Sequence, residues 1–464
     1  MKVVKFGGSS VADAGQFQKV KAIIDQDVNR QIVVISAAGK YGNATRKLTD
    51  TLYLIADSME AGRDVEPLFN QVLARLEAIN IALQLNVPLI KLLHTIRHHL
   101  AIRYSRDYLV SRGEFLTAHL MAAYLGYTFV DAANLLFFNK AGAIDEAKTQ
   151  TAYQQLASHH GIVVPGFYGR DADGHVKLMP RGGSDISGAW LARLAHADLY
   201  ENWTDVSGIK MADPRIIKDA DSIDVMSYDE LRELTYMGFS VFQEEAVQPV
   251  RECGIPTRIL NTNAPEDPGT LIIHDDDPAS DLKTITGIAG RKHYLVITVR
   301  KYQLALHLEV IQHALGVVAA HHLVVDYLPT GIDSFSLLIR EPRRQVSVQE
   351  LTAEIAAACQ PDKMEVTENV ALIAMVSRKL RQRPAIAGKV LAYLDDNLLN
   401  VQLVSQTNDD INLLIGVHDL DYDKAVRVIY SSIHQNFQRP APYIEGIASV
   451  SYTHLRAHET SQDL

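Results

Sequence analysis

The first part of the chain alternates apolar runs with an amphipathic stretch. Lys2–Phe6 is a short apolar run that stops at two glycines, and Gln31–Ile35 is a second apolar run, so both are predicted to be buried strands. The amphipathic stretch between them, from about Gln16 to Asp27, is predicted to be a helix. Strand, helix and strand in such close succession form a βαβ unit, which predicts a largely parallel sheet.

This alternation continues to about residue 275. A mostly helical region is predicted from about Leu48 to Leu125, with interruptions near Pro67 and Pro88. The further elements predicted are strands at Tyr127–Asp131, Gly161–Val164 and Asp198–Trp203, a hairpin turn at Asp171–Gly174 and a helix at Ser184–Ala195. Together these elements predict an open α/β sandwich.

The pattern changes after the acidic, proline-bearing segment His274–Pro278, which is predicted to be a linker. Two successive modules then have the order strand, helix, strand, strand, helix, strand. In the second module the elements predicted are strands at Asn369–Val376, Val401–Ser405 and Ile411–Val417 and helices at about Ala385–Asp395 and Tyr422–His434. This is a duplicated ferredoxin-like βαββαβ pattern, which is compatible with many functions.

Composition limits the classes of protein to consider. The 464 residues, 47% of them hydrophobic, suggest about three domains with sizeable cores. Lysine and arginine number 45 against 55 aspartates and glutamates, and this net charge of −10 argues against nucleic acid as the main partner. The two distant cysteines, Cys253 and Cys359, form no disulfide framework, which fits a reducing compartment. No apolar run is long enough for a membrane span, so a cytoplasmic protein is predicted.

Two glycine-rich turns are the main candidates for chemistry. In Lys5–Ser10 (KFGGSS) the glycines allow a close approach to an anion, the following helix start offers free N–H groups, and Lys5 adds a charge. The lysine precedes the glycines, so this is not a Walker A loop, and an ordinary tight turn is the competing interpretation. In Arg181–Asp185 (RGGSD) the arginine can hold a carboxylate with two hydrogen bonds. Asp185 lies in the first turn of the predicted helix, where it could take part in the chemistry of the site or simply stabilise the helix end.

Two further segments are weaker candidates. Thr204–Gly208 follows a predicted strand, where open α/β sheets bind ligands, and Arg215 nearby is suited to a phosphate or to plain solvation. Glu114 lies at the start of an apolar helical run, where a glutamate usually only stabilises the helix end. It becomes a candidate for function only if the fold brings it next to Arg181. The 18 histidines show no HExxH spacing and the aspartate runs show no EF-hand spacing, so no metal site of the protein's own is predicted.

In order and spacing these motifs resemble the aspartate kinases of the amino-acid kinase superfamily. The segments that carry the resemblance are KFGGSSVAD (Lys5–Asp13), SRGEFLTA (Ser111–Ala118), PGFYG (Pro165–Gly169), RGGSD (Arg181–Asp185), TDVSGIKMADPR (Thr204–Arg215) and PTGIDSFS (Pro329–Ser336). The resemblance covers about residues 2–448. It implies a three-layer αβα catalytic domain at 1–275, a linker at 276–284 and two ACT modules at 285–367 and 368–450. Residues 451–464 continue no pattern and are expected to be a disordered or non-native tail.

The activity implied is ATP- and Mg²⁺-dependent phosphorylation of the β-carboxylate of L-aspartate, the first step toward lysine, threonine and methionine. Lys5 and Asp185 would be catalytic. The residues that would bind ATP are Lys5, Gly7, Gly8, Ser9, Thr204, Asp205, Lys210 and Arg215. The residues that would bind aspartate are Ser36, Thr49, Glu114, Phe167, Arg181 and Ser184, with Glu114 at the α-ammonium and Arg181 at the α-carboxylate.

The ACT modules imply feedback by an amino acid, lysine as the first choice and threonine as the second. Weaker candidates for effector contacts are Asp333, Ser334, Gln406 and Asn408. A homodimer or a dimer of dimers is expected, with neither nucleic acid nor membrane as a partner. Two other interpretations remain open: another amino-acid kinase, acting on glutamate or on a nucleoside monophosphate, and a catalytically silent amino-acid sensor.

Overall fold

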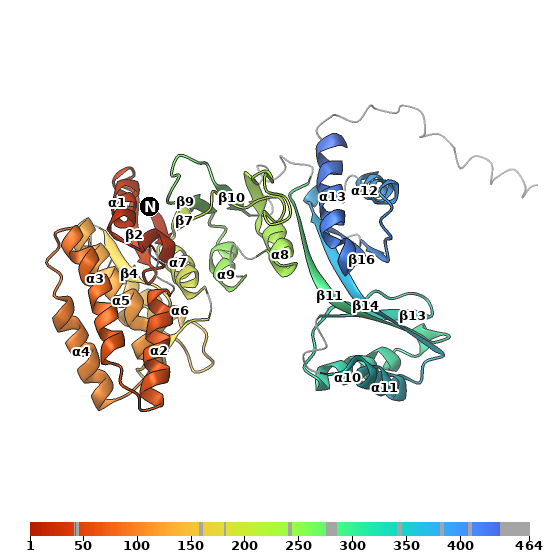
Figure 1. Ribbon diagram of the computed structural model, residues 1–464, viewed down its shortest axis with the longest axis horizontal. Helices are drawn as coiled ribbons and strands as arrows, with labels where there is room; N and C mark the ends of the chain where they lie inside the picture. The colour runs from red at the N-terminus through yellow and green to blue at the C-terminus, as the bar shows by residue number, and fades with distance from the viewer. Residues whose placement is uncertain are drawn as a thin grey trace, which may run out of the picture.

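The structure is a computed structural model that describes residues 1–40, 42, 46–156, 161–180, 182–239, 244–274, 285–340, 346–380, 385–406 and 411–436. Its first part is built on an eight-stranded sheet with the order β3-β4-β2-β1-β7-β9-β10-β8 (Figure 1). The strands are β1 (Lys2–Phe6), β2 (Arg30–Ile35), β3 (Thr128–Phe129), β4 (Ile162–Pro165), β7 (Leu199–Thr204), β8 (Val225–Ser227), β9 (Thr257–Asn261) and β10 (Thr270–Ile273). All neighbouring strands run parallel except β9 and β10, so the predicted parallel sheet is confirmed.

Helices cover both faces of this sheet because successive strand residues point to opposite sides. Val4 packs with the helices α1–α5, and its neighbour Val3 packs with the helices on the other face. The helices are α1 (Ala14–Asp25), α2 (Leu48–Glu60), α3 (Glu66–Ala82), α4 (Leu89–Ile102), α5 (Arg106–Leu125), α6 (Glu146–Gln154), α7 (Gly183–Leu194), α8 (Tyr228–Tyr236) and α9 (Glu244–Glu252). The predicted three-layer αβα sandwich is therefore confirmed.

The predicted element boundaries hold to within a few residues. The helical region is interrupted, as predicted, just before Pro67, which lies in the first turn of α3, where the missing N–H of proline needs no partner. The predicted turn at Asp171–Gly174 joins β5 (Tyr168–Arg170) to β6 (Val176–Leu178) as an antiparallel hairpin.

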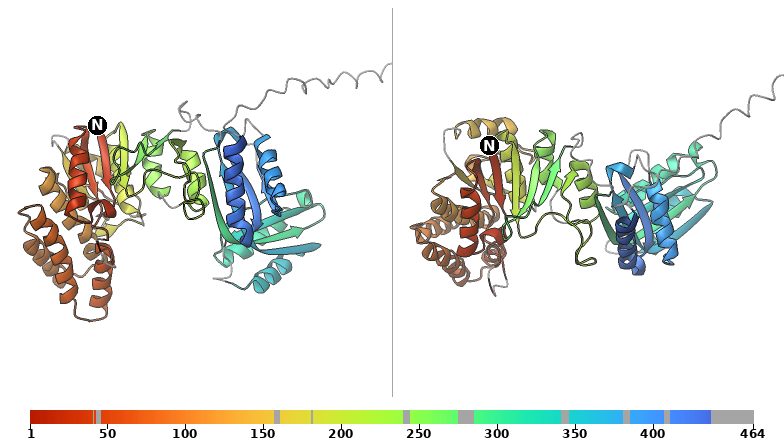
Figure 2. Two further views of the ribbon diagram at one scale, coloured as in Figure 1. Left: turned by 45° about the horizontal axis from the view of Figure 1, so that its top comes forward. Right: turned by 90° about the horizontal axis from the view of Figure 1, so that it is seen from above.

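The C-terminal part has the predicted element order, but its two modules share one sheet. The six strands have the order β12-β13-β11-β14-β16-β15, and β11 pairs along its whole length with β14. The elements are β11 (Gly287–Arg300), α10 (Glu309–Ala320), β12 (Val325–Tyr327), β13 (Ser334–Arg340), α11 (Val348–Cys359), β14 (Lys363–Val376), α12 (Ala385–Asp396), β15 (Leu403–Ser405), β16 (Asn412–His418) and α13 (Tyr422–Asn436). Figures 1 and 2 show the pairs α10/α11 and α12/α13 toward opposite ends of the two long strands.

The shared strands change the composition of the second module. Gly287–Arg291, the first half of β11, pairs with the second half of β14 and so occupies the fourth-strand position of the second module. The strand predicted there from its own sequence, after His434, lies outside the described residues, as do the predicted linker at 276–284 and the tail at 451–464. The predicted domain boundaries remain predictions.

Helix α8 connects the eight-stranded sheet to the shared sheet. The Asp326 carboxylate on β12 is fully buried and accepts hydrogen bonds from the Tyr236 hydroxyl at the end of α8 (2.6 Å) and from Tyr294 of β11 (2.5 Å). Arg340 donates two further hydrogen bonds to the same carboxylate (2.7 and 2.8 Å). The first module therefore contacts the N-terminal part of the chain through a network of polar side chains and not through a linker alone.

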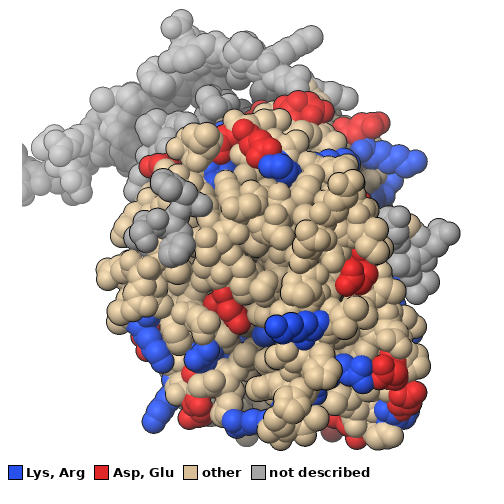
Figure 3. Space-filling view, turned by 90° about the vertical axis from the view of Figure 1, so that its left-hand side faces the viewer, with Lys and Arg blue, Asp and Glu red and all other residues tan. Residues whose placement is uncertain are grey.

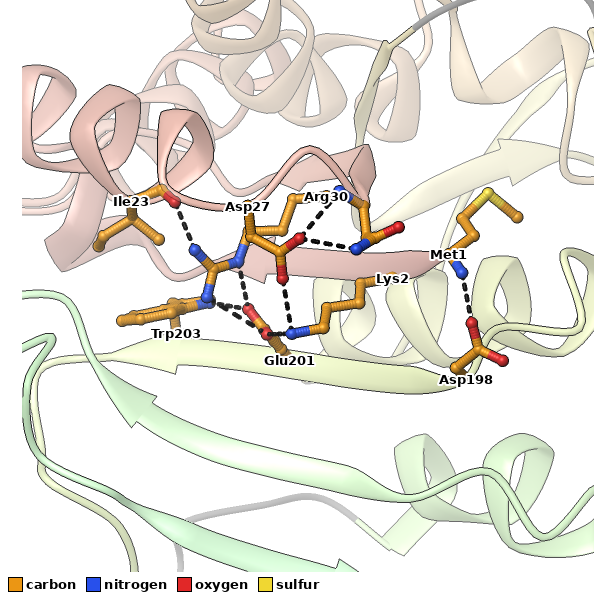
Figure 4. Close-up of polar contacts among 9 residues, drawn as sticks. Met1, Lys2, Ile23, Asp27, Arg30, Asp198, Glu201 and Trp203 are labelled. Carbon is orange, nitrogen blue, oxygen red and sulfur yellow. Dashed lines mark hydrogen bonds and ion pairs between the residues drawn. The ribbon is translucent and has the colours of Figure 1, made fainter.

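A buried charge cluster joins strands β1, β2 and β7 near their amino ends (Figure 4). Glu201 is 2% exposed, and its carboxylate accepts hydrogen bonds from Arg30 (2.8 Å) and from the Trp203 indole (2.9 Å). Lys2 contacts the same carboxylate (3.1 Å) and also Asp27 (2.8 Å). The cluster lies at the strand ends opposite to the glycine turn that follows β1.

Replacing Glu201 by glutamine is expected to destabilise the protein by roughly 3–5 kcal/mol, because the buried Arg30 guanidinium loses its counter-charge. The matched control is Asp198→Asn, which removes an exposed contact to the terminal amine of Met1 and should cost only about 0–1 kcal/mol. Urea unfolding of both variants measures this difference. Equal losses of unfolding free energy in the two variants would show that the buried ion pair contributes no more to stability than the exposed contact.

On the end of the molecule seen in Figure 3, lysine and arginine side chains are interspersed with aspartate and glutamate, so this face carries no continuous basic field. Within the described ranges, no helix has both the length and the apolar character that crossing a membrane requires.

Candidate active site

The first glycine turn lies at the carboxyl end of the central strand β1. The Gly7 N–H donates to the Trp203 carbonyl of β7 (2.9 Å), and the Gly39 N–H donates to the Gly8 carbonyl (2.7 Å). A Cβ atom on Gly8 would lie 2.8 Å from the Ala37 carbonyl oxygen, and one on Gly39 would lie 2.6 Å from the Gly8 backbone. Both glycines are therefore needed for the loops after β1 and β2 to touch backbone to backbone.

Lys5 reaches from β1 to the second glycine turn. Its Nζ lies 2.5 Å from Oδ1 of Asp185, and both side chains are largely buried, 9% and 16% exposed. Asn202, which pairs with Lys5 across β1 and β7, donates its Nδ2 to the same oxygen (2.8 Å) and lies 3.4 Å from Nζ through its own Oδ1. The sequence thus correctly predicted that the two turns meet, but it did not indicate Asn202.

The second turn is tightly packed against the Pro165–Gly169 segment. Gly182 has φ = 83° at the start of α7, and a Cβ on Gly183 would lie 2.7 Å from the Phe167 ring. Phe167 has φ = 77°, and its N–H donates to the Ser187 hydroxyl (3.1 Å). Ser184 packs against Gly166, the neighbour of Phe167, and the predicted roles of Phe167 and Ser184 at the substrate stay predictions. Arg181 lies outside the described residues, so its predicted contact with the substrate stays a prediction.

Glu114 is a buried carboxyl group with spare hydrogen-bonding capacity. It is 4% exposed on α5, and its Oε2 is buried without a hydrogen-bond partner among the residues that the structure describes. Burial raises the pKa of Glu114 to about 8, although the Ala37 backbone and the charge of Arg112 favour the ionised form. A buried carboxyl in this state is suited to receive a cation such as an ammonium group.

Glu114 is connected to the first glycine turn through the loop after β2. A Cβ on Gly113 would lie 2.9 Å from Cβ of Ala37, and the Ala38 N–H donates to the Thr117 hydroxyl (3.3 Å). This loop is the one that contacts Gly8. Helix α5, the loop after β2 and the glycine turn after β1 therefore form a continuous packed unit.

Ser36 and Thr49 flank that loop. The Ser36 N–H donates to the Phe6 carbonyl (3.2 Å), and Thr49 lies in the first turn of α2, half-buried. Arg75 of α3 donates to the Gly39 carbonyl and was missed, because nothing in the sequence of α3 distinguishes it from a surface arginine.

The predicted nucleotide residues divide into two groups. Thr204 ends β7 beside the glycine turn: its carbonyl accepts from the Thr262 N–H (2.9 Å), and the Thr262 hydroxyl bonds to that of Ser10 (2.7 Å). Thr204 also bonds to Asp205 (3.2 Å).

The second group belongs to the loop that follows β7. Lys210 donates to Ser222 (3.0 Å). Arg215 is 88% exposed and paired with Asp213 (2.6 Å). No contact among the described residues links either side chain to Lys5, so their predicted roles at ATP stay predictions.

The effector candidates lie on separate modules. Asp333 accepts from the Gln303 N–H (2.8 Å) and Ser334 begins β13, both in the first module, while Gln406 is exposed in the second. Asn408 lies outside the described residues. Among the described residues no group of three His, Cys, Asp or Glu side chains is arranged to hold a metal ion.

Comparisons with known proteins agree with this arrangement. The amino acid kinase family matches residues 1–261, and an ACT domain matches residues 373–433. The chain is 32% identical to aspartokinase 3 of Bacillus subtilis, over 93% of this chain and 98% of that protein. It is 26% identical to the lysine-sensitive aspartokinase 3 of Escherichia coli, over 93% of this chain and 99% of that protein.

A solved structure gives the same result. The crystal structure of the aspartate kinase from Clostridium acetobutylicum superposes with a TM-score of 0.85 at 40% identity, over 93% of this chain and 99% of that one. The chain belongs to the aspartokinases, within the amino acid kinase family.

Proposed function

We propose that the protein transfers the γ-phosphoryl group of ATP to the β-carboxylate of L-aspartate at the place where the two glycine turns meet. The observation that carries this proposal is the Lys5–Asp185 contact, which brings the phosphate-binding turn and the amino-acid-binding turn to one place. Lys5 stabilises the negative charge on the transferring phosphoryl group, and Asp185 together with Asn202 holds the Lys5 ammonium in position.

ATP lies along the turn after β1 in this proposal. The backbone of Gly7, Gly8 and Ser9 approaches the phosphates, and Thr204 and Asp205 border the nucleotide at the end of β7. Lys210 and Arg215 would have to leave their present partners to reach it. Mg²⁺ prefers oxygen ligands, and the phosphates of ATP together with the Asp185 carboxylate fit that preference. When bound, the ion withdraws negative charge from the phosphate oxygens.

L-Aspartate lies between α5 and the second turn. Glu114 pairs with its α-ammonium, Arg181 with its α-carboxylate, and Phe167, Ser184, Ser36 and Thr49 line the pocket. The attacking carboxylate is ionised at neutral pH, so no general base is needed. Catalysis then consists of positioning and of charge stabilisation around a loose transition state.

Trapping of the acyl phosphate with hydroxylamine tests the substrate class. With MgATP, hydroxamate is expected from L-aspartate and from neither L-glutamate nor UMP. Hydroxamate from L-glutamate alone, or ADP formation only with UMP, would assign the chain to another amino-acid kinase activity. No product with any of the three would favour an amino-acid sensor.

The ACT modules support feedback control by an amino acid, and lysine is the first choice because one relative is named lysine-sensitive. An effector acts only if it binds two states of the enzyme with different affinity. Lysine is expected to inhibit the hydroxamate assay and to raise the unfolding temperature at the same concentrations, with threonine as the comparison. If neither amino acid changes activity or unfolding temperature, this regulatory assignment is wrong.

Assembly into a homodimer or a dimer of dimers is part of the same proposal. Leu306, Leu308 and Ile332 of the first module are 73%, 64% and 87% exposed, and such apolar side chains are typical of a covered surface.

Both cysteines are free thiols, Cys253 exposed and Cys359 buried, which supports the reducing conditions of the cytoplasm.

A further inference from the structure

A second polar cavity lies behind helix α5. It has a volume of about 550 Å³ and is bordered by the end of α4, the α4–α5 connection, the segment after β3 and the β5–β6 hairpin. Arg112 lines it. Because residues two positions apart on a helix point to nearly opposite sides, Arg112 faces away from Glu114 and the substrate cleft. None of the residues assigned to ATP or aspartate lines this cavity.

Arg112 is a buried cation that forms no ion pair among the described residues. It is 4% exposed, and its charge favours the ionised form of the Glu114 carboxyl group, with which it makes no direct contact. Its guanidinium donates to the Tyr108 carbonyl (3.1 Å) and to the Ser111 hydroxyl (2.8 Å), which are neutral acceptors. The rings of Tyr108, Phe115 and Tyr168 surround it at 4.3, 4.4 and 5.1 Å. Hydrogen bonds to neutral acceptors only partly compensate the burial of a charge, so an anion at this position would be stabilising.

The other charged groups at the cavity do not supply that anion. The Asp131 carboxylate already accepts from the Tyr168 hydroxyl (2.8 Å) and from the Ala133 N–H (3.0 Å). Arg170 donates to a neutral amide, Asn134 (2.7 Å), and Arg103 is exposed at the rim. Three arginines and one carboxylate therefore line the cavity, and among the described residues none of the three forms an ion pair with that carboxylate.

We propose that this cavity is a binding site for a small oxyanion, carrying a carboxylate or a phosphate group, distinct from the catalytic cleft. Arg112 forms its floor, and Arg103 and Arg170 close on the ligand from the rim, since guanidinium groups bind the planar edges of both anion types with paired hydrogen bonds. The cavity has the size of a small-metabolite site.

Titration calorimetry with inorganic phosphate and with citrate tests the proposal and separates the two anion types. The full-length protein is compared with the double variant Arg103→Gln/Arg170→Gln, which changes only rim residues, and with Arg112→Gln. Arg63→Gln is the matched control, because Arg63 is an exposed arginine away from the cavity. Lys5→Met removes binding of the same anions in the catalytic cleft.

At least one of the two anions is expected to bind, with a Kd raised tenfold or more in both cavity variants and unchanged in Arg63→Gln and Lys5→Met. If Arg112→Gln fails to fold, the rim variant alone decides the result. The proposal is overturned if neither anion binds, if the rim variant binds as tightly as the unaltered protein, or if binding is lost with Lys5→Met.

Discussion

Replacing Lys5 by methionine is expected to lower kcat by roughly 10²–10³-fold, a loss of about 3–4 kcal/mol of transition-state stabilisation, while KM for ATP changes little. The Lys5 ammonium lies 2.5 Å from Asp185 and is nearly buried, so water cannot replace its charge. Its effect should appear mainly when negative charge moves onto the transferring phosphoryl group, which is why kcat responds more than KM.

The matched control for this experiment is Lys19→Met, because Lys19 is an exposed lysine of α1 whose ammonium contacts Asn263. This control should keep normal kinetics. Circular dichroism and urea unfolding establish that both variants are folded. Near-normal turnover of a folded Lys5→Met protein would remove Lys5 from the catalytic role.

Replacing Glu114 by glutamine is expected to raise KM for L-aspartate by an amount equivalent to roughly 2–5 kcal/mol, with little change in KM for ATP. The buried Oε2 of Glu114 has no partner among the described residues, so the substrate ammonium would be its ion-pair partner. Glutamine keeps the size of the side chain but removes the charge. Initial rates with each substrate varied separately measure the effect.

The raised pKa of Glu114 adds a pH dependence with a definite sign. Burial raises this pKa to about 8 in the empty site, so the carboxyl holds a proton at pH 7. Binding of an ammonium group favours the ionised form, and the proton is therefore released when L-aspartate binds.

Affinity for L-aspartate is accordingly expected to rise between about pH 6 and pH 8 and to level off above, where the carboxyl is already ionised. Calorimetry in two buffers of different ionisation enthalpy counts the released protons. Glu114→Gln should release none, and proton uptake by the unaltered protein would contradict this role.

Much of the catalytic fold follows from local pattern. The apolar runs at Lys2–Phe6 and Gln31–Ile35 with a helix between them are sufficient to predict a parallel sheet, and the glycines after β1 predict where the site lies. The Lys5–Asp185 contact follows from two glycine turns at the same edge of that sheet. Asn202 could have been found from its position, since it is a polar residue near the carboxyl end of a predicted strand, where open α/β sheets bind ligands.

Other features depend on contacts that local pattern does not contain. Gly287–Arg291 continues directly into the rest of β11, so nothing in the local sequence indicates that this segment pairs within the second module. Arg215 belongs to a motif that predicts a contact with a phosphate group. In the structure its side chain pairs instead with Asp213, two residues earlier in the sequence. The cavity at Arg112 is formed by three segments distant in sequence, and only the folded chain brings them together.

The most direct test of one shared cleft is a side-by-side kinetic comparison of Lys5→Met and Glu114→Gln, with L-aspartate and MgATP varied independently. The arrangement predicts a crossed result: Lys5→Met loses kcat and keeps its KM for L-aspartate, whereas Glu114→Gln raises that KM and affects ATP little. If both folded variants kept normal kcat and normal KM for both substrates, the two glycine turns and α5 would not form the catalytic centre.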